Sequence, residues 1–237
     1  MKHTQQLTLF AGLLAVSTLA SADITNGPNP YAAGFGFDTP AEAAWGGWNR
    51  GDAGTIYAEW DTFVDNSYAG TRTAAPDIGQ SGAGNVNLSW NAGTFAAGSG
   101  NLYSFSVPET FTASLTATAG SEPVRAVLQF ETWGVQMDYS AILLNGLAPT
   151  YSAQTFYDAA YASSFGAVEL VQHLVYWDLE QAAAQYLFSF GSAEHSMSLA
   201  QVAVDIGPAP VPLPTAAWLL GSGLLGLTGL SRRSRPA

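Results

Sequence analysis

Apolar and polar residues alternate along several short stretches in the middle of the chain, and this pattern constrains the fold more than any other feature. In residues 111–118 every second side chain is apolar, beginning with Phe111, and each residue between is Ser or Thr. Residues 124–132 carry Val, Ala, Leu and Phe at alternate positions. Successive side chains of a β-strand point to opposite faces, so these stretches predict strands with one buried face. Further strands are predicted within residues 55–64, 101–107, 186–190 and 197–206.

Turn-forming residues separate these runs. Glycine-rich clusters occupy residues 82–85, 98–101 and 120–123, and Asn145-Gly146 is the best candidate for a two-residue hairpin turn. The alternation slips phase near Ala200 and Gln201, which predicts a β-bulge. Residues 167–179 stay apolar for longer and could form one buried strand or two, whereas 154–164 are predicted to form a loop or a short helix. This spacing favours an all-β fold, an antiparallel β-sandwich of jelly-roll type.

The first residues have the features of a secretory signal peptide. Lys2 and His3 precede an apolar run over residues 7–19, and small residues follow at 20–22. Cleavage after Ala22 would leave a mature chain that begins at Asp23. The alternative, a membrane anchor, is disfavoured by the short apolar run and the small residues that end it.

The last thirty residues combine an extended segment, an apolar run and a basic cluster. Pro212 and Pro214 disfavour a helix, whereas residues 215–230 carry no charge and could form a membrane helix of about 24 Å. Arginines at 232, 233 and 235 would keep the following end on the cytoplasmic side. A buried C-terminal helix is the alternative, but such a helix would not usually end in an arginine cluster.

This tail resembles the sorting signal of PEP-CTERM proteins, which are exosortase substrates of Gram-negative bacteria. The matching residues are Val211, Pro212, Leu213, Pro214 and Trp218, the apolar run, and Arg232, Arg233 and Arg235. Leu213 stands where the family has the glutamate that gives it its name. The resemblance covers only the last residues of the chain. It implies processing by an exosortase and association with exopolysaccharide at the cell surface.

Between the two ends, residues 23–207 are predicted to form one extracellular domain, with residues 208–237 as the sorting signal. This body holds three arginines and all eighteen acidic residues, a net charge of −15. Such a surface repels nucleic acid. The chain has no cysteine, which excludes disulfides, thiolate metal sites and cysteine nucleophiles.

The sequence offers little for catalysis. His173 lies in an apolar run and is predicted to be packed, and His195 is predicted to lie in an exposed turn. Glu59/Asp61 and Asp178/Glu180 are spaced to share a strand face, which a glycoside hydrolase could use, but a solvated acidic edge is the preferred interpretation. A calcium ion bound by loop oxygens is possible, yet no calcium-loop motif is present and no ligands can be named.

Trp45 and Trp48 are the only candidate ligand-binding residues in the body. They flank Gly46-Gly47 in a polar stretch, and exposed indole rings can stack on sugars. Packing in a core or loop is the preferred alternative for this pair. The other tryptophans in predicted strands, Trp60, Trp133 and Trp177, are assigned to the core.

These observations give three functions in order of preference. The first is an exported, non-enzymatic protein of the cell surface or extracellular matrix, associated with polysaccharide. The second is a carbohydrate-binding module of the same fold, which would need exposed aromatic rings or a polar groove. The third is a secreted glycoside hydrolase, which would need carboxylates clustered in a cleft.

Overall fold

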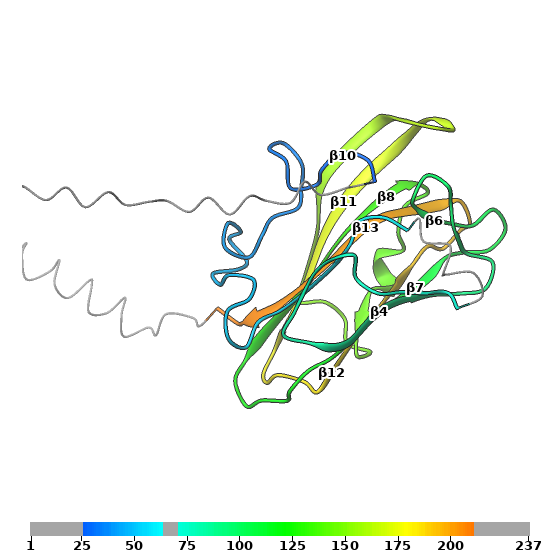
Figure 1. Ribbon diagram of the computed structural model, residues 1–237. Helices are drawn as coiled ribbons and strands as arrows, with labels where there is room; N and C mark the ends of the chain where they lie inside the picture. The colour runs from blue at the N-terminus through cyan, green and yellow to red at the C-terminus, as the bar shows by residue number, and fades with distance from the viewer. Residues whose placement is uncertain (1–25, 64–70, 211–237) are drawn as a thin grey trace, which may run out of the picture.

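The computed structural model describes residues 26–63 and 71–210 (Figure 1). Within these ranges the regular elements are thirteen β-strands and one short 3-10 helix, η2 (Tyr139–Ala141), so the all-β prediction is confirmed. None of the helices in this part of the chain is long and apolar enough to cross a membrane. The predicted signal peptide and the membrane helix over 215–230 lie outside the described residues.

The larger of two antiparallel sheets has eight strands. Its main path runs β10-β11-β8-β13-β1-β3, and β6 joins it by pairing with β13 and with β5. In that order the strands are β10 (Tyr151–Ser163), β11 (Gly166–Leu179), β8 (Val124–Gly134), β13 (Met197–Pro208), β1 (Ile56–Trp60), β3 (Ile78–Ser81), β6 (Leu102–Tyr103) and β5 (Phe95–Ala96).

The smaller sheet has five strands in the order β2-β4-β7-β12-β9. They are β2 (Thr73–Ala74), β4 (Gly84–Trp90), β7 (Thr110–Thr116), β12 (Gln185–Gly191) and β9 (Leu143–Leu144). Burial alternates strictly along most of β7, as its sequence predicted. On β7, threonine and serine therefore occupy the outer face, and the apolar residues face inward.

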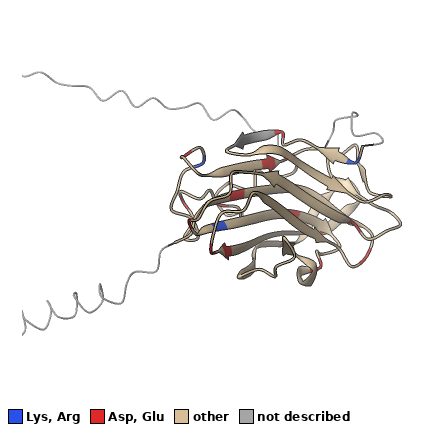
Figure 2. Cartoon of the chain, turned by 90° about the horizontal axis from the view of Figure 1, so that it is seen from below, with Lys and Arg blue, Asp and Glu red and all other residues tan. Residues whose placement is uncertain are grey.

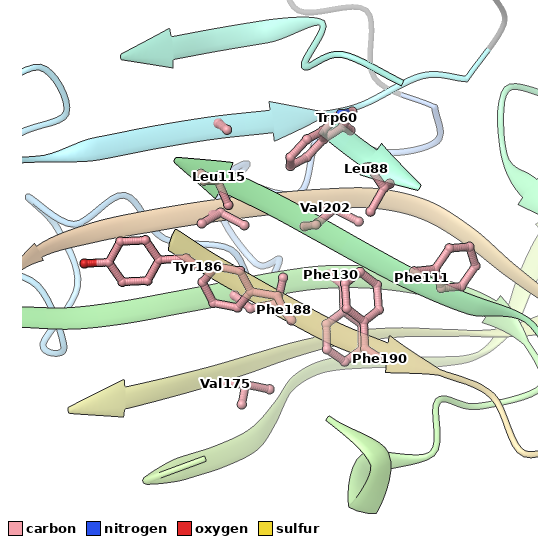
Figure 3. Close-up of a cluster of buried hydrophobic side chains, with 14 of the residues drawn as sticks. Trp60, Leu88, Phe111, Leu115, Phe130, Val175, Tyr186, Phe188, Phe190 and Val202 are labelled. Atoms are coloured by element: carbon pink, nitrogen blue, oxygen red, sulfur yellow. The ribbon is translucent and has the colours of Figure 1, made fainter. Parts of the chain in front are cut away.

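The main core lies between the two sheets (Figure 3). Apolar side chains from both sheets form one buried cluster, in which Trp60, Phe130 and Phe188 are almost completely enclosed. Phe130 of β8 stacks on Phe190 of β12, with ring centroids 6.0 Å apart. The Trp60 indole also donates a hydrogen bond of 3.1 Å to the carbonyl oxygen of Ala74 in β2. This bond and the ring packing tie the sheets together.

Several local predictions are confirmed. The register of β13 against β8 shifts between Leu199 and Gln201, so the bulge lies where the alternation slipped. Asn145 and Gly146 have φ values of 50° and 80°, and Leu144 bridges Leu147 across them in a tight turn. The run over residues 167–179 is one strand, β11, rather than two.

The prediction of a loop or short helix in residues 154–164 is wrong, because β10 runs through nearly all of it. Within the described residues β10 pairs only with β11, and most of its side chains are exposed or half-buried. An edge strand with two accessible faces needs no regular apolar alternation, which explains the missed strand. The predicted strand over residues 101–107 is also too long, since β6 ends at Tyr103.

Acidic residues, coloured red in Figure 2, are spread over the strands and loops of the chain. The basic side chains in the described residues are those of Arg50, Arg72 and Arg125. Arg50 and Arg125 both form ion pairs with carboxylates, as described below. The acidic character predicted from composition is therefore distributed over the molecule.

Candidate functional site

An N-terminal segment, residues 26–55, covers part of the face of the large sheet that points away from the small sheet. The side chain of Gln129 in β8 binds the backbone of Asp38 twice, accepting from its N–H at 2.9 Å and donating to its carbonyl at 3.0 Å. Gln172 in β11 accepts another backbone N–H of the segment, and Gln201 in β13 donates to two of its carbonyl oxygens. We call these three side chains the glutamine clasp.

A buried ion-pair network lies beside the glutamine clasp. The Arg50 guanidinium donates two hydrogen bonds of 2.8 Å to Asp205 of β13 and lies 3.6 Å from Glu59 of β1. It also sits 3.7 Å from the ring centroid of Tyr57. The side chains of Glu59 and Asp205 are each only 1% exposed. Burial raises the pKa of both carboxyls, and the hydrogen bonds and charge of Arg50 oppose that rise for Asp205.

The carboxylate pair Glu59/Asp61 lies at this network and is not exposed to solvent. Both residues are buried, Glu59 in contact with Arg50 and hydroxyl groups and Asp61 at the end of β1. The preferred interpretation of a solvated edge is therefore wrong for this pair. A catalytic role in a hydrolase does not fit this pair either, because a carboxylate enclosed in this way cannot reach a polysaccharide.

Trp45 and Trp48 are buried, with 7% and 6% of their surface exposed. Their rings meet edge to face at 5.9 Å and pack on Val127 and Leu174 of the large sheet. Trp48 lies directly over Gly207, where an added methyl group would overlap the indole. The speculative assignment of this pair to ligand binding is corrected: neither indole offers an open face, and the packing alternative describes both.

Glu131 of β8 is a third buried carboxylate under the N-terminal segment. It accepts hydrogen bonds from the Trp133 indole at 2.7 Å and from the Gln172 amide at 2.6 Å. Burial raises the pKa of Glu131 to about 7, and those two hydrogen bonds limit the rise. The Gln172 amide nitrogen donates to Glu131, and its oxygen accepts a backbone N–H of the N-terminal segment, so one side chain links the two.

This raised pKa predicts a pH-dependent stability. The folded protein holds the Glu131 proton more tightly than the unfolded chain does. The contribution of protonated Glu131 to the free energy of unfolding is therefore fully present below pH 4.5 and is lost as the pH rises to about 7. Across this window the Glu131→Gln variant should gain stability relative to the wild type, by on the order of 3 kcal/mol. Urea unfolding at a series of pH values measures the difference.

Glu122→Gln removes the same charge from an exposed turn and serves as the control for net charge. Parallel pH profiles for wild type and Glu131→Gln would contradict the raised pKa.

The two histidines in the described part of the chain are placed as predicted. His173 is buried between the rings of Phe130 and Tyr139, and its Nε2 lies 2.8 Å from the Ser152 hydroxyl. Burial lowers the pKa of His173 to about 4, so it is neutral at pH 7. His195 is exposed in the turn before β13, where Nδ1 bonds to Ser196. Among the described residues, both imidazole rings hydrogen-bond to serine hydroxyls.

The second acidic pair, Asp178/Glu180, is exposed at the end of β11, in agreement with the solvated interpretation. Asp178 forms a two-point ion pair with Arg125, at 2.6 and 2.8 Å. Across residues 26–63 and 71–210, no group of three or more His, Asp or Glu side chains is arranged to hold a metal ion. The calcium hypothesis, which also involves backbone carbonyl oxygens, stays a prediction.

An accessible pocket of about 290 Å³ lies elsewhere, where the tip of the β10–β11 hairpin meets the β5–β6 hairpin. Its apolar wall consists of Phe95, Tyr103, Phe105, Trp133, Phe165 and Val168. Serine, asparagine, glycine and alanine complete the lining, and it contains no charged side chain. We call this site the aromatic pocket.

The rings of the aromatic pocket are unusually exposed for phenylalanine. Phe165 is 77% exposed, Phe105 is 62% exposed and Phe95 is 40% exposed. Tyr103 connects them, with its centroid 4.8 Å from that of Phe105 and 6.3 Å from that of Phe165. Trp133 is by contrast buried and fixed through its indole N–H to Glu131. The pocket thus combines a buried, hydrogen-bonded indole with phenylalanine rings that are largely exposed.

The sequence pattern did not predict this pocket. A strand over residues 101–107, as predicted, would put Tyr103 and Phe105 on one face, whereas β6 ends at Tyr103 and Phe105 lies beyond it. The available signal was the position of Phe165, an aromatic residue set between Ser163-Ser164 and Gly166, where a turn rather than a core is expected. The distance in sequence between the two hairpins concealed their proximity.

Comparison with protein-family models, with curated proteins and with solved structures finds no match for this chain.

Proposed function

We propose that this chain is an exported, non-enzymatic protein of the bacterial cell surface or extracellular matrix. The observation that carries the non-enzymatic part of this proposal is the state of the titratable side chains in the body. Glu59, Asp205 and His173 are all buried and held in packing or hydrogen-bond networks. Groups enclosed in this way are suited to holding the fold together rather than to proton transfer with a substrate.

The two ends of the chain would direct its export. In this proposal residues 1–22 are removed as a signal peptide, and residues 208–237 are recognised by an exosortase at the inner membrane. The resemblance to PEP-CTERM tails supports the second step. The body, residues 23–207, would then reach the surface and associate with exopolysaccharide. We also propose that its two sheets form a sandwich of jelly-roll type.

Replacing Arg232, Arg233 and Arg235 with serine tests the sorting step. Without these charges the positive-inside preference is lost, so we expect the tail to remain uncut and the full-length exported form to accumulate. Immunoblotting of envelope and medium fractions for a C-terminal epitope measures this. Arg72→Ser, which removes an exposed charge from the body, should be processed like the wild type. Equal processing of the triple variant and the wild type would contradict the proposal.

A carbohydrate-binding module is the second candidate function. The specific observation in its favour is the aromatic pocket, with three exposed phenylalanines around a concave and uncharged surface. Concave sites with apolar walls and a few polar groups are the usual form of a small-ligand site. This function is compatible with export and could supply the association with polysaccharide.

A further inference from the structure

The exposed rings of the aromatic pocket indicate a binding site. Large apolar side chains that gather at the surface of a monomer commonly mark an interaction site. Phe95 of β5, Phe105 just after β6 and Phe165 at the tip of the β10–β11 hairpin converge on one hollow, with the rings of Phe95 and Phe105 stacked at 5.8 Å. The hollow is concave, so it suits a compact group better than a flat protein surface.

The charge of the site limits the ligand. The chain as a whole carries a net charge of −11, yet the lining of the pocket contains neither an acidic nor a basic side chain. An anionic ligand would approach an acidic protein and find no cation to pair with, and a cation would find no carboxylate. A neutral ligand is therefore the class that the pocket fits.

The polar groups of the lining restrict the chemical class of the ligand further. Ser99 and Ser164 are exposed in the two hairpins, and their hydroxyls make no hydrogen bond to another described side chain or backbone group. Asn101 and Ser198 are instead bonded to each other, at 2.5 Å. Free hydroxyls beside aromatic faces suit a ligand that has both hydroxyl groups and a face of C–H bonds. The negative face of an aromatic ring attracts such polarised hydrogens.

We propose that the aromatic pocket binds one neutral hexopyranose unit of a polysaccharide. The C–H face of the sugar packs on Phe165 and Phe105, and its hydroxyls bond to Ser99 and Ser164. A volume of about 290 Å³ lies at the lower end of the range of small-ligand sites, which suits a single sugar unit. This inference rests on the second candidate function and is independent of the sorting tail.

Isothermal titration of the full chain with cellohexaose, maltohexaose and mannohexaose tests this inference. We expect saturable binding of at least one of these probes and none of an alginate oligosaccharide. Phe105→Ala and Phe165→Ala should each weaken binding by about tenfold, since truncating an aromatic anchor removes much of the energy of a site. Binding should change less than about twofold when salt is raised from about 50 mM to about 500 mM, because the ligand is uncharged.

Leu147→Ala is the matched control, because Leu147 is also an exposed apolar side chain but lies in the turn after β9. It should bind like the wild type, and circular dichroism should show the same fold for all variants. If the wild type binds a neutral probe and both phenylalanine variants bind it equally well, the assignment of the aromatic pocket as the binding site is overturned while carbohydrate binding stands. If none of the probes binds, the inference and the second candidate function both fail. If only alginate binds, the inference is overturned while carbohydrate binding stands. None of these results bears on export.

Discussion

Replacing Arg50 with alanine should lower the free energy of unfolding by about 3–5 kcal/mol, because it leaves two carboxylates buried without a cation. Asp205 loses its two-point ion pair, and Glu59 loses the charge 3.6 Å away. Neither carboxylate can turn to solvent, since both side chains are 1% exposed under the N-terminal segment. Guanidinium-induced unfolding followed by circular dichroism measures the loss.

Arg72→Ala is the control for the Arg50 prediction. It removes the same side chain from an exposed position at which no ion pair is formed with a described residue, and its unfolding midpoint should match that of the wild type. A double variant, Arg50→Met with Asp205→Leu, should recover part of the loss, because replacing a buried ion pair by apolar groups is often neutral. A midpoint for Arg50→Ala equal to that of the wild type would show that the network contributes nothing to stability.

Trp60→Ala should cost about 3–5 kcal/mol, the usual range for deleting a large aromatic side chain from a core. Trp60 is 1% exposed, and its indole N–H donates to the carbonyl oxygen of Ala74 in the opposite sheet. The variant therefore opens a cavity between the sheets and leaves a buried carbonyl without this donor. Urea unfolding, monitored by far-ultraviolet circular dichroism, measures the change.

Two further variants separate the contributions at this position. Trp60→Phe keeps a ring in the core and should lose less stability than Trp60→Ala, with the remainder reflecting the hydrogen bond and the smaller ring. Phe105→Ala truncates an aromatic ring at an exposed site, so its unfolding should differ little from that of the wild type. Equal losses for the Trp60 and Phe105 truncations would contradict the placement of the core.

The strands that bury one face could be predicted from sequence, because burial of one face places apolar residues at every second position. Strand β7 is the clearest case, and even the bulge in β13 was visible as a slip in that period. The edge strand β10 has no such alternation in its sequence, since both of its faces are accessible. Register and neighbouring strands depend on contacts between distant residues, which alternation alone does not specify.

The N-terminal segment could not be predicted for a different reason. Its backbone is held by side chains of the large sheet, so its own sequence needs no periodic pattern. Gln129, Gln172 and Gln201 are ordinary polar residues until the register of three strands brings them under one segment. The same holds for Trp45 and Trp48, whose polar surroundings in sequence hid their apolar surroundings in space.

The most direct test of an exported protein addressed by its two ends is the intact mass of the chain recovered from envelope and medium fractions. We predict a polypeptide that begins at Asp23 and has lost Arg232, Arg233 and Arg235. Recovery of the chain from the cytosol with Met1 and all three arginines in place would contradict the account.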